Sequence, residues 1–370
     1  MKKKVCHIST AHSETDGRIL YKECTSLSKA GYNVSYVVTS DCEKSINGVN
    51  IIPLKKSNGR IDRFIRKRKE AYKKALQLDA DIYHFHDPEL LGVGNKLKKQ
   101  GKKVIYDSHE DTPKQILSKN YLGFMWMRKI VANIFRIYEK NISRKFDAII
   151  SPQDTRIPYF LNINSNTVKI ENYALRSEAV KTKAFPRNED EKDKLILIYV
   201  GSITKIRGIR EIITPLPQFE GKVELWLLGT WENDEIRGQC EKLEGYKYTR
   251  YLGCVPGDEI YSYIKSADIG LSVLYPTENY KEAIPTKVFD YMSCNKPVIL
   301  SNFYNWEKLF GDVGVYVDPL KVEEIAQAVK KYLNDKESMV KQGEKNRKTF
   351  DEKFSWEMHE REFLDIYEKM

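Results

Sequence analysis

The chain has 370 residues, of which 41% are hydrophobic and 31% are charged, a length that predicts two domains and a composition that excludes disordered and collagen-like proteins. It contains no apolar run of about 18 residues, so we expect no membrane-spanning helix, and its early polar residues argue against a signal peptide. Six scattered cysteines and a net charge of +10 predict a cytoplasmic protein with reduced thiols and an anionic partner.

Short, continuous apolar runs alternate with helical patterns along the whole chain. We expect strands at 4–10, 33–40, 49–54, 81–87, 103–109 and 147–152, and then at 195–201, 223–229, 249–255, 268–275, 297–301 and 313–319. Continuous apolar runs are typical of parallel strands that are buried on both faces. The pattern therefore predicts an α/β chain with two Rossmann-like, doubly wound domains.

One segment interrupts this alternation. Residues 176–194 contain 11 charged residues among 19 and have no periodicity, so we expect a linker there. The predicted domains are 1–178 and 179–353. The last segment, 354–370, is predicted to form an amphipathic helix. Its apolar residues on or near one face are Trp356, Phe363, Leu364 and Tyr367.

In the first half, polar residues follow three of the predicted strands, where doubly wound sheets bind ligands. The loop 9–18 contains Asp16, Gly17 and Arg18, and it either holds an anionic group or is an ordinary connection. The next candidates follow the fourth and fifth strands. They are His86, Asp87, His109 and Glu110. Two strand ends that both carry histidine and carboxylates favour a polar active-site floor.

The second half has a sharper pattern. The segment Gly201–Gly208 follows a strand and carries Lys205 and Arg207, which suit a phosphate group at a helix start. Further on, we expect Pro285 in a first helical turn, with Lys287 and Asp290 on one face and Glu282 in the loop before it. A carboxylate there can accept hydrogen bonds from sugar hydroxyls, although a solvated charged helix face is the alternative.

Several other chemistries find no support in the sequence. No local spacing of histidine, cysteine or carboxylate is typical of a metal site, and no serine lies in a hydrolase elbow. We therefore expect no metal and no bound cofactor. A nucleic-acid-binding protein is also not supported, because no aromatic–glycine RNA-binding motif or recognition helix is present.

Taken in order, these blocks resemble a known family. The stretches DGRILYKEC from Asp16, HDPELL from His86 and YDSHED from Tyr106, followed by Glu282-x7-Asp290, resemble family 4 glycosyltransferases that build bacterial surface polysaccharides such as capsule and O-antigen. The resemblance covers essentially the whole chain. It implies the GT-B fold, with an acceptor-binding first domain, a donor-binding second domain, a central cleft, and a last helix that crosses back to the first domain.

The resemblance also implies roles for residues. His109 and Glu282 would act at the donor sugar, Asp290 would bind the ribose, and Arg207, with Lys205 or Lys287, would bind the pyrophosphate. The turn Gly253–Val255 would receive the base. The chain departs from the family pattern in three places: Asp290 replaces a glutamate, Ser202 stands where many relatives carry arginine, and 283–285 replaces a glycine-rich stretch.

The implied reaction moves a sugar with retention of configuration and without a metal. The donor would be a nucleotide sugar, UDP-sugar by analogy with relatives, and the acceptor a glycan, expected to be lipid-linked. Two alternatives stay open: a nucleotide-sugar epimerase of the same fold, and a non-catalytic subunit of polysaccharide assembly.

Two basic segments of the first half suggest where the acceptor lies. Residues 60–74 hold eight Lys or Arg, and residues 121–145 mix six Lys or Arg with bulky apolar residues. On a helix, Met127, Ile130, Ile134 and Tyr138 would share a face. The helix either packs in the core with a solvated basic face or contacts the anionic inner surface of the plasma membrane, because Phe124, Met125 and Trp126 exceed what a core needs.

Overall fold

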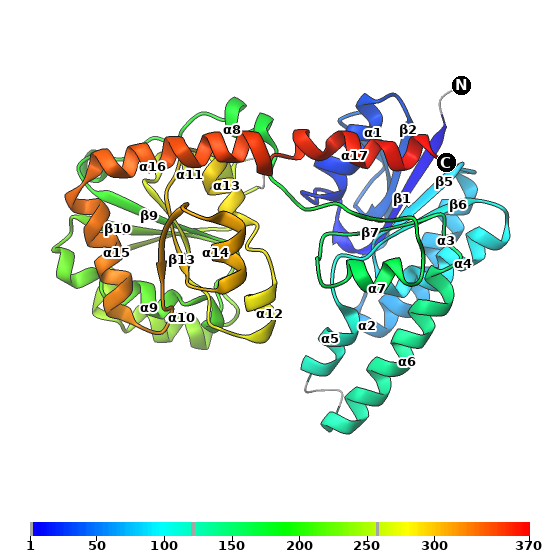
Figure 1. The fold of residues 1–370 in the computed structure, drawn as a ribbon, viewed down its shortest axis with the longest axis horizontal. Helices are drawn as coiled ribbons and strands as arrows, with labels where there is room; N and C mark the ends of the chain where they lie inside the picture. The colour runs from blue at the N-terminus through cyan, green and yellow to red at the C-terminus, as the bar shows by residue number, and fades with distance from the viewer. Residues whose placement is uncertain (1–2, 120–122, 257–258) are drawn as a thin grey trace. The chain divides into compact units, whose positions relative to one another are not determined.

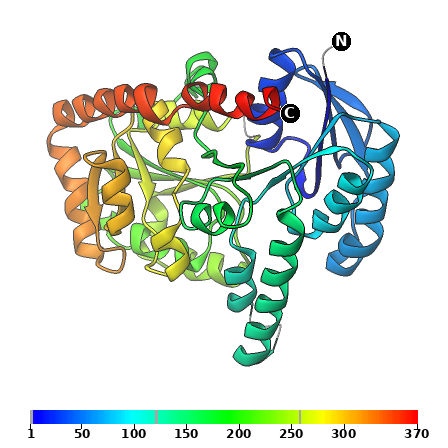
Figure 2. The same cartoon turned by 45° about the vertical axis from the view of Figure 1, so that its right-hand side comes forward.

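The computed structural model describes residues 3–119, 123–256 and 259–370. The described chain forms two compact units (Figure 1). The first comprises Met1–Asn172 together with His359–Met370, and the second comprises Tyr173–Met358. Each unit contains a sheet flanked by helices, as Figure 2 also shows.

The sheet of the first unit has the strand order β3-β4-β2-β1-β5-β6-β7-β8. Its strands are β1 (Lys4–Ser13), β2 (Asn33–Thr39), β3 (Lys44–Ile46), β4 (Val49–Leu54), β5 (Ile82–Phe85), β6 (Lys103–Asp107), β7 (Ala148–Ser151) and β8 (Thr167–Lys169). All pairs are parallel except β3 with β4. Its helical segments are η1 (Ile19–Cys24), α1 (Thr25–Lys29), α2 (Gly59–Asp62), η2 (Arg63–Lys67), α3 (Arg68–Gln77), η3 (Pro88–Leu90), α4 (Leu91–Lys99), α5 (Thr112–Ser118), α6 (Met125–Ser143) and α7 (Ile157–Leu161).

The sheet of the second unit is fully parallel, in the order β11-β10-β9-β12-β13-β14. Its strands are β9 (Leu195–Val200), β10 (Val223–Leu228), β11 (Thr249–Gly253), β12 (Ile269–Ser272), β13 (Val298–Ser301) and β14 (Gly314–Val317). Its helical segments include α8 (Arg176–Lys181), η6 (Lys205–Arg207), α9 (Ile209–Ile213), α10 (Asp234–Glu241), α11 (Ile260–Ser266), α12 (Glu278–Glu282), α13 (Lys287–Ser293), α14 (Tyr304–Phe310), α15 (Val322–Asn334) and α16 (Lys336–Thr349).

Both sheets have the Rossmann arrangement. Counting from the first strand of each unit, and leaving out the short edge strands β3 and β8, the order is 3-2-1-4-5-6. The direction of winding reverses between β1 and β5 in the first unit and between β9 and β12 in the second. Ligands of this fold bind beyond the carboxyl ends of the strands at that reversal, so each unit has one place to search for a site.

The last helix, α17 (Trp356–Glu368), begins in the second unit, and its part from His359 onward belongs to the first. Phe363, Ile366 and Tyr367 are buried there, whereas Leu364 is only half-buried. The hydroxyl of Tyr367 lies 2.6 Å from Nδ1 of His84, which places the helix against β5. The prediction that the last helix returns to the first domain is thus confirmed.

Residues 176–194 do not form the free linker that their charge predicts. The division between the units falls earlier, after Asn172. The segment packs on the second unit, where the Phe185 ring stacks on Tyr263 at 4.4 Å and Arg187 pairs with Asp268 at 2.8 Å. Fixed partners on the unit that follows explain why a charged stretch can be ordered.

Candidate functional site

The site of the second unit lies where β9 and β12 end. Strand β9 is followed by Gly201, whose backbone has φ +127°. The carbonyl oxygen of Gly201 is so close to Gly229, the residue after β10, that a Cβ on Gly229 would lie 1.9 Å from it. The two loops therefore pack backbone against backbone, which requires glycine at both positions.

Two cations lie beside this loop. The Nζ of Lys287, at the start of α13, lies 3.7 Å from the centroid of the Tyr199 ring, and a Cβ on Gly201 would lie 3.5 Å from that Nζ. The guanidinium of Arg207 lies 5.0 Å from the ring centroid of Tyr280. The structure thus brings Gly201, Arg207 and Lys287 together, as predicted for a phosphate site.

Lys287 is electrostatically unusual. Its Nζ is buried and has no hydrogen-bond partner within residues 3–119, 123–256 and 259–370. Burial, reinforced by the charge of Arg207, holds the pKa of this ammonium well below its usual range, although the carboxylate of Asp290 opposes the shift. An anion bound at Lys287 and Arg207 would relieve this penalty.

The acids of the predicted pair differ in environment. Asp290 is half-buried in α13, and its Oδ1 accepts a hydrogen bond of 2.9 Å from the hydroxyl of Tyr261. Glu282 is exposed at the end of α12. Pro285 precedes α13 instead of lying in its first turn, because α13 begins at Lys287. Tyr261 had no motif around it, so sequence reasoning missed it.

Other residues that were predicted to bind the donor are exposed or lie on another strand. Ser202 and Lys205 are exposed. Gly253 ends β11, two strands away from β9, where its carbonyl accepts a hydrogen bond from the Gly229 amide, and Val255 packs against apolar residues. The helix expected after the phosphate loop, α9, has five residues after a one-turn η6, too short for a strong dipole.

In the first unit, the polar residues after β1, β5 and β6 meet. Nε2 of His109 lies 2.9 Å from Oδ2 of Asp107, the last residue of β6, and 3.2 Å from Nδ1 of His86. His109 is half-buried, whereas Asp107 is fully buried. A carboxylate in this position fixes the tautomer and orientation of an imidazole, as general acid–base chemistry requires.

Arg18 pairs with Asp107 and with Glu23 inside the unit, at 3.1 and 2.8 Å. Burial alone would raise the pKa of Asp107, but the guanidinium of Arg18 and the hydrogen bonds of His109 and His86 hold it well below its usual range. Burial also lowers the pKa of His86 to about 4.

Three of the predicted acceptor residues are therefore structural. Arg18, His86 and Asp87 are all buried, and Asp87 accepts hydrogen bonds from Ser9 Oγ (2.9 Å) and from the amide of Ala11 (3.2 Å). They were predicted to face an acceptor, but their burial closes them to one. Sequence patterns could not show this, because their partners lie in distant segments.

The loop after β1 contains a further histidine that sequence reasoning did not single out. Nδ1 of His12 lies 2.9 Å from Oδ2 of Asp16, and the His12 ring lies 5.0 Å from the His109 ring. Asp16 also accepts the amide hydrogens of Arg18 and Ile19 through Oδ1. Gly17 and Glu110 are exposed, and in the described part of the chain no atom beyond the two neighbouring residues lies within 4 Å of a Cβ built on Gly17.

Part of the second unit is similar to a known family. Residues 180–349 match the family described as "Glycosyl transferases group 1". The chain is 30% identical over 144 residues to O-antigen chain mannosyltransferase B of Escherichia coli, a match that covers 37% of this chain and 36% of that protein. The chain thus aligns with about a third of that relative's length.

Solved structures share the fold over the whole chain. Sucrose-phosphate synthase from Thermosynechococcus elongatus superposes with a TM-score of 0.76 at 18% identity, covering 100% of this chain and 99% of that one. Anabaena HepE in complex with UDP and glucose superposes with a TM-score of 0.72 at 14% identity, covering 100% of both chains. Residues 180–349 therefore match the group 1 glycosyltransferase family, and the whole chain has the GT-B fold.

Proposed function

We propose that the protein transfers a sugar, with retention of configuration, from a nucleotide-sugar donor to a glycan acceptor. The observation that carries the proposal is the pair Lys287 and Arg207 beside the Gly201 loop, within the domain that matches the group 1 family. A diphosphate supplies the anion that this buried Nζ needs: among the described residues it has no hydrogen-bond partner, and it lies against the face of the Tyr199 ring. The solved structure of HepE, which contains UDP, supports a uridine nucleotide as the first candidate.

The proposed chemistry is electrostatic. Negative charge grows on the departing diphosphate as the sugar bond breaks, and Arg207 and Lys287 stabilise that charge without a metal at the phosphate. We propose that Asp290 accepts hydrogen bonds from the ribose hydroxyls, beside Tyr261. Glu282 and His109 are proposed to act at the transferred sugar.

The test measures turnover with a panel of UDP-, GDP- and ADP-sugars as donors. A detergent extract of bacterial lipids supplies the acceptor. We expect release of one nucleoside diphosphate and a product whose anomeric configuration, read by NMR coupling, matches the donor. Glu282→Gln and His109→Ala should each lower kcat by about 100-fold. Conversion of the donor to another nucleotide sugar without an acceptor would instead indicate an epimerase, and the absence of any turnover would indicate a non-catalytic subunit.

We further propose that the acceptor is lipid-linked and is met at an anionic membrane surface by α6. In both Figures 1 and 2 this helix extends beyond the sheet of the first unit. Trp126, Ile130, Ile134 and Ile137 follow one helical face, and Trp126 and Ile134 are 63% and 62% exposed. The residues of the predicted face, Met127, Ile130, Val131, Ile134 and Tyr138, are also exposed, so the alternative of core packing is not supported. Tyr121, which the sequence placed in the same segment, lies outside the described residues.

Charge supports an anionic bilayer as the partner. Lys129, Arg136 and Lys140 are exposed along the adjoining face of α6, and η2 adds exposed Phe64 and Ile65 beside a basic run. Apolar side chains flanked by cations are typical of a helix that lies in a membrane interface. Among the described residues, no helix is both long and apolar enough to span a bilayer.

Vesicle sedimentation tests this surface. With phosphatidylcholine vesicles that contain about a third phosphatidylglycerol, we expect binding at low salt that weakens as salt screens the charges. The double variant Trp126→Ser, Ile130→Ser should lose most of this binding. Tyr304→Ser, which changes an exposed aromatic residue of the second unit, is the matched control. Wild-type protein that stays in the supernatant at low salt would contradict the proposal.

A further inference from the structure

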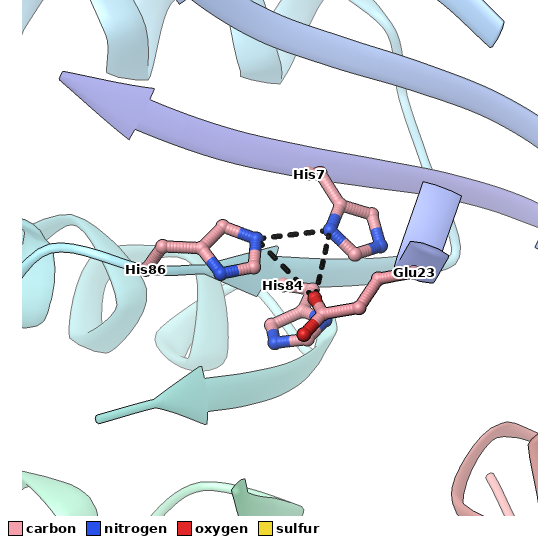
Figure 3. Close-up of side chains that lie close together, drawn as sticks. All are labelled: His7, Glu23, His84 and His86. Carbon is pink, nitrogen blue, oxygen red and sulfur yellow. Dashed lines mark hydrogen bonds and ion pairs between the residues drawn. The ribbon is translucent and has the colours of Figure 1, made fainter. Parts of the chain in front are cut away.

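A cluster of ligand-type side chains lies inside the first unit, apart from the proposed phosphate site. It consists of His7 on β1, Glu23 on η1, His84 on β5 and His86 directly after β5. All four side chains are buried. Figure 3 shows His7, His86 and Glu23 converging on one another, with His84 beside the carboxylate. Each offers one ligand atom, and these atoms lie within 4.8 Å of one another.

The spacing of these atoms suits one metal ion. Nδ1 of His7 lies 3.0 Å from Nε2 of His86, and Oε2 of Glu23 lies 4.0 and 3.9 Å from these two nitrogens. Zinc bonds of about 2.0–2.1 Å in a tetrahedron place ligand atoms about 3.3 Å apart. Three of these pairs lie within about 0.7 Å of that spacing, and all four ligand atoms lie within 4.8 Å of one another, so shifts of about 0.5 to 1.5 Å would bring them to bonding distance.

The outer nitrogens of the histidines already have oxygen partners. Nδ1 of His84 and Nε2 of His7 lie 2.6 and 3.2 Å from the hydroxyl of Tyr367, and Nδ1 of His86 lies 3.3 Å from Oδ2 of Asp107. When each of these nitrogens donates its hydrogen outward, the other nitrogen of the ring points a lone pair inward. Metal-bound histidines are oriented by such outer hydrogen bonds.

Two inward atoms are left without a hydrogen bond. Oε2 of Glu23 and Nε2 of His84 are buried and have no hydrogen-bond partner in the part of the chain that the structure describes. A buried polar atom left in this state destabilises the fold, and a bound cation would offset that cost.

We propose that His7, Glu23, His84 and His86 bind one divalent cation, and that their nitrogen and carboxylate ligands select zinc. Four protein ligands leave no open position, so the ion is structural: it ties η1 to β1 and β5 beneath His109. This site departs from the expectation of a metal-free chain, because its ligands come from three segments and have no local spacing. It is independent of the proposed sugar transfer.

Elemental analysis of the full chain, purified without a polyhistidine tag, tests the proposal. We expect about one zinc ion per chain in the wild type. His84→Gln removes an inward ligand and should lower the occupancy to below about a fifth after dialysis against a weak chelator. His359→Gln, a histidine of α17 outside the cluster, is the matched control and should keep the ion.

Two further readouts keep the test decisive if His84→Gln does not fold. Cobalt added to the metal-depleted wild type should give the visible absorption of a tetrahedral site, and zinc should raise its Tm. His109→Asn should keep the ion, because His109 belongs to a different group of ligand atoms, with Asp107 and the other nitrogen of His86. A wild type that neither contains nor binds zinc, or loss of the ion in His109→Asn only, would overturn the proposal.

Discussion

At the scale of single residues, the burial of the Lys287 ammonium opposes folding but favours the binding of an anion. A buried ammonium without a hydrogen bond destabilises the folded chain, and the charge of Arg207 adds to the cost. The same features support the proposal that a diphosphate binds at this position. Stability and binding should therefore respond in opposite directions when the charge is removed.

Replacing Lys287 by Met should stabilise the free protein by about 1 kcal/mol at neutral pH, because the apolar chain stays and the buried charge goes. The native pKa of Lys287 lies below its unfolded value, so the unfolded chain binds more protons between the two pKa values. The stability of the wild type should thus rise with pH in that window, relative to Lys287→Met.

Urea unfolding of both proteins at pH 7 and pH 9.5, followed by the fluorescence of the second unit, measures this difference. Lys330→Met, on the exposed face of α15, is the control and should change neither the free energy of unfolding nor its pH dependence. A destabilised Lys287→Met, or an identical pH dependence in the two proteins, would contradict the electrostatic account.

The sequence predicted some of the site residues and missed others. Arg207, Lys287 and Asp290 were found because they belong to continuous segments that follow strands. His12 and Tyr261 were missed, and the burial of Arg18, His86 and Asp87 was not foreseen. Those properties depend on partners that lie far away in sequence, such as Asp107 for Arg18. The role of each residue in catalysis stays a prediction.

At the scale of elements, all twelve predicted strands are present, because each is a continuous apolar run. The strands that were missed, β3 and β8, have three residues each and lie at the edges of the sheet, where few apolar residues are needed. The exposure of α6 could not be predicted, since the same amphipathic pattern fits a core helix. Only the tertiary structure shows which face has no neighbour.

In the loop 201–208, the backbone conformation and close packing require glycine at Gly208, which connects η6 to α9. Its backbone has φ +68°, and a Cβ there would lie 2.2 Å from the carbonyl oxygen of Val273. Gly208→Ala should therefore destabilise the second unit by about 2 kcal/mol or more.

Gly238→Ala is the matched control for this element. Gly238 lies in α10, with open space around its Cβ position, so the added methyl should stabilise the unit by about 0.5–1 kcal/mol. Differential scanning calorimetry reads both changes as shifts in Tm. Equal shifts in the two variants would show that the loop is not sterically constrained as described.

At the scale of the whole molecule, the last helix belongs to the same unit as the first strand. Phe363 and Tyr367 of α17 are buried in the first unit, and the hydroxyl of Tyr367 lies near both His7 and His84. The apolar pattern of the last helix was visible in the sequence. That this helix crosses back was implied only by the resemblance to a family, since an amphipathic helix does not specify its partner.

Phe363→Ala should therefore destabilise the first unit by about 3–5 kcal/mol, the usual cost of removing a buried aromatic ring, and leave the second unit unchanged. Hydrogen exchange with mass spectrometry, read separately on peptides from each unit, measures this. Glu362→Ala, at an exposed position of the same helix, should have little effect. Equal loosening of both units by Phe363→Ala would contradict the assignment of α17 to the first unit.

The central claim is that the second unit binds a nucleoside diphosphate at Lys287 and Arg207. The most direct measurement is calorimetric titration of UDP, GDP and ADP into the wild type, Lys287→Met and Lys330→Met. We predict that one nucleotide binds selectively, that Lys287→Met weakens it by about 10- to 100-fold, and that Lys330→Met binds like the wild type. Binding of no nucleotide, or equal binding by Lys287→Met, would contradict the account.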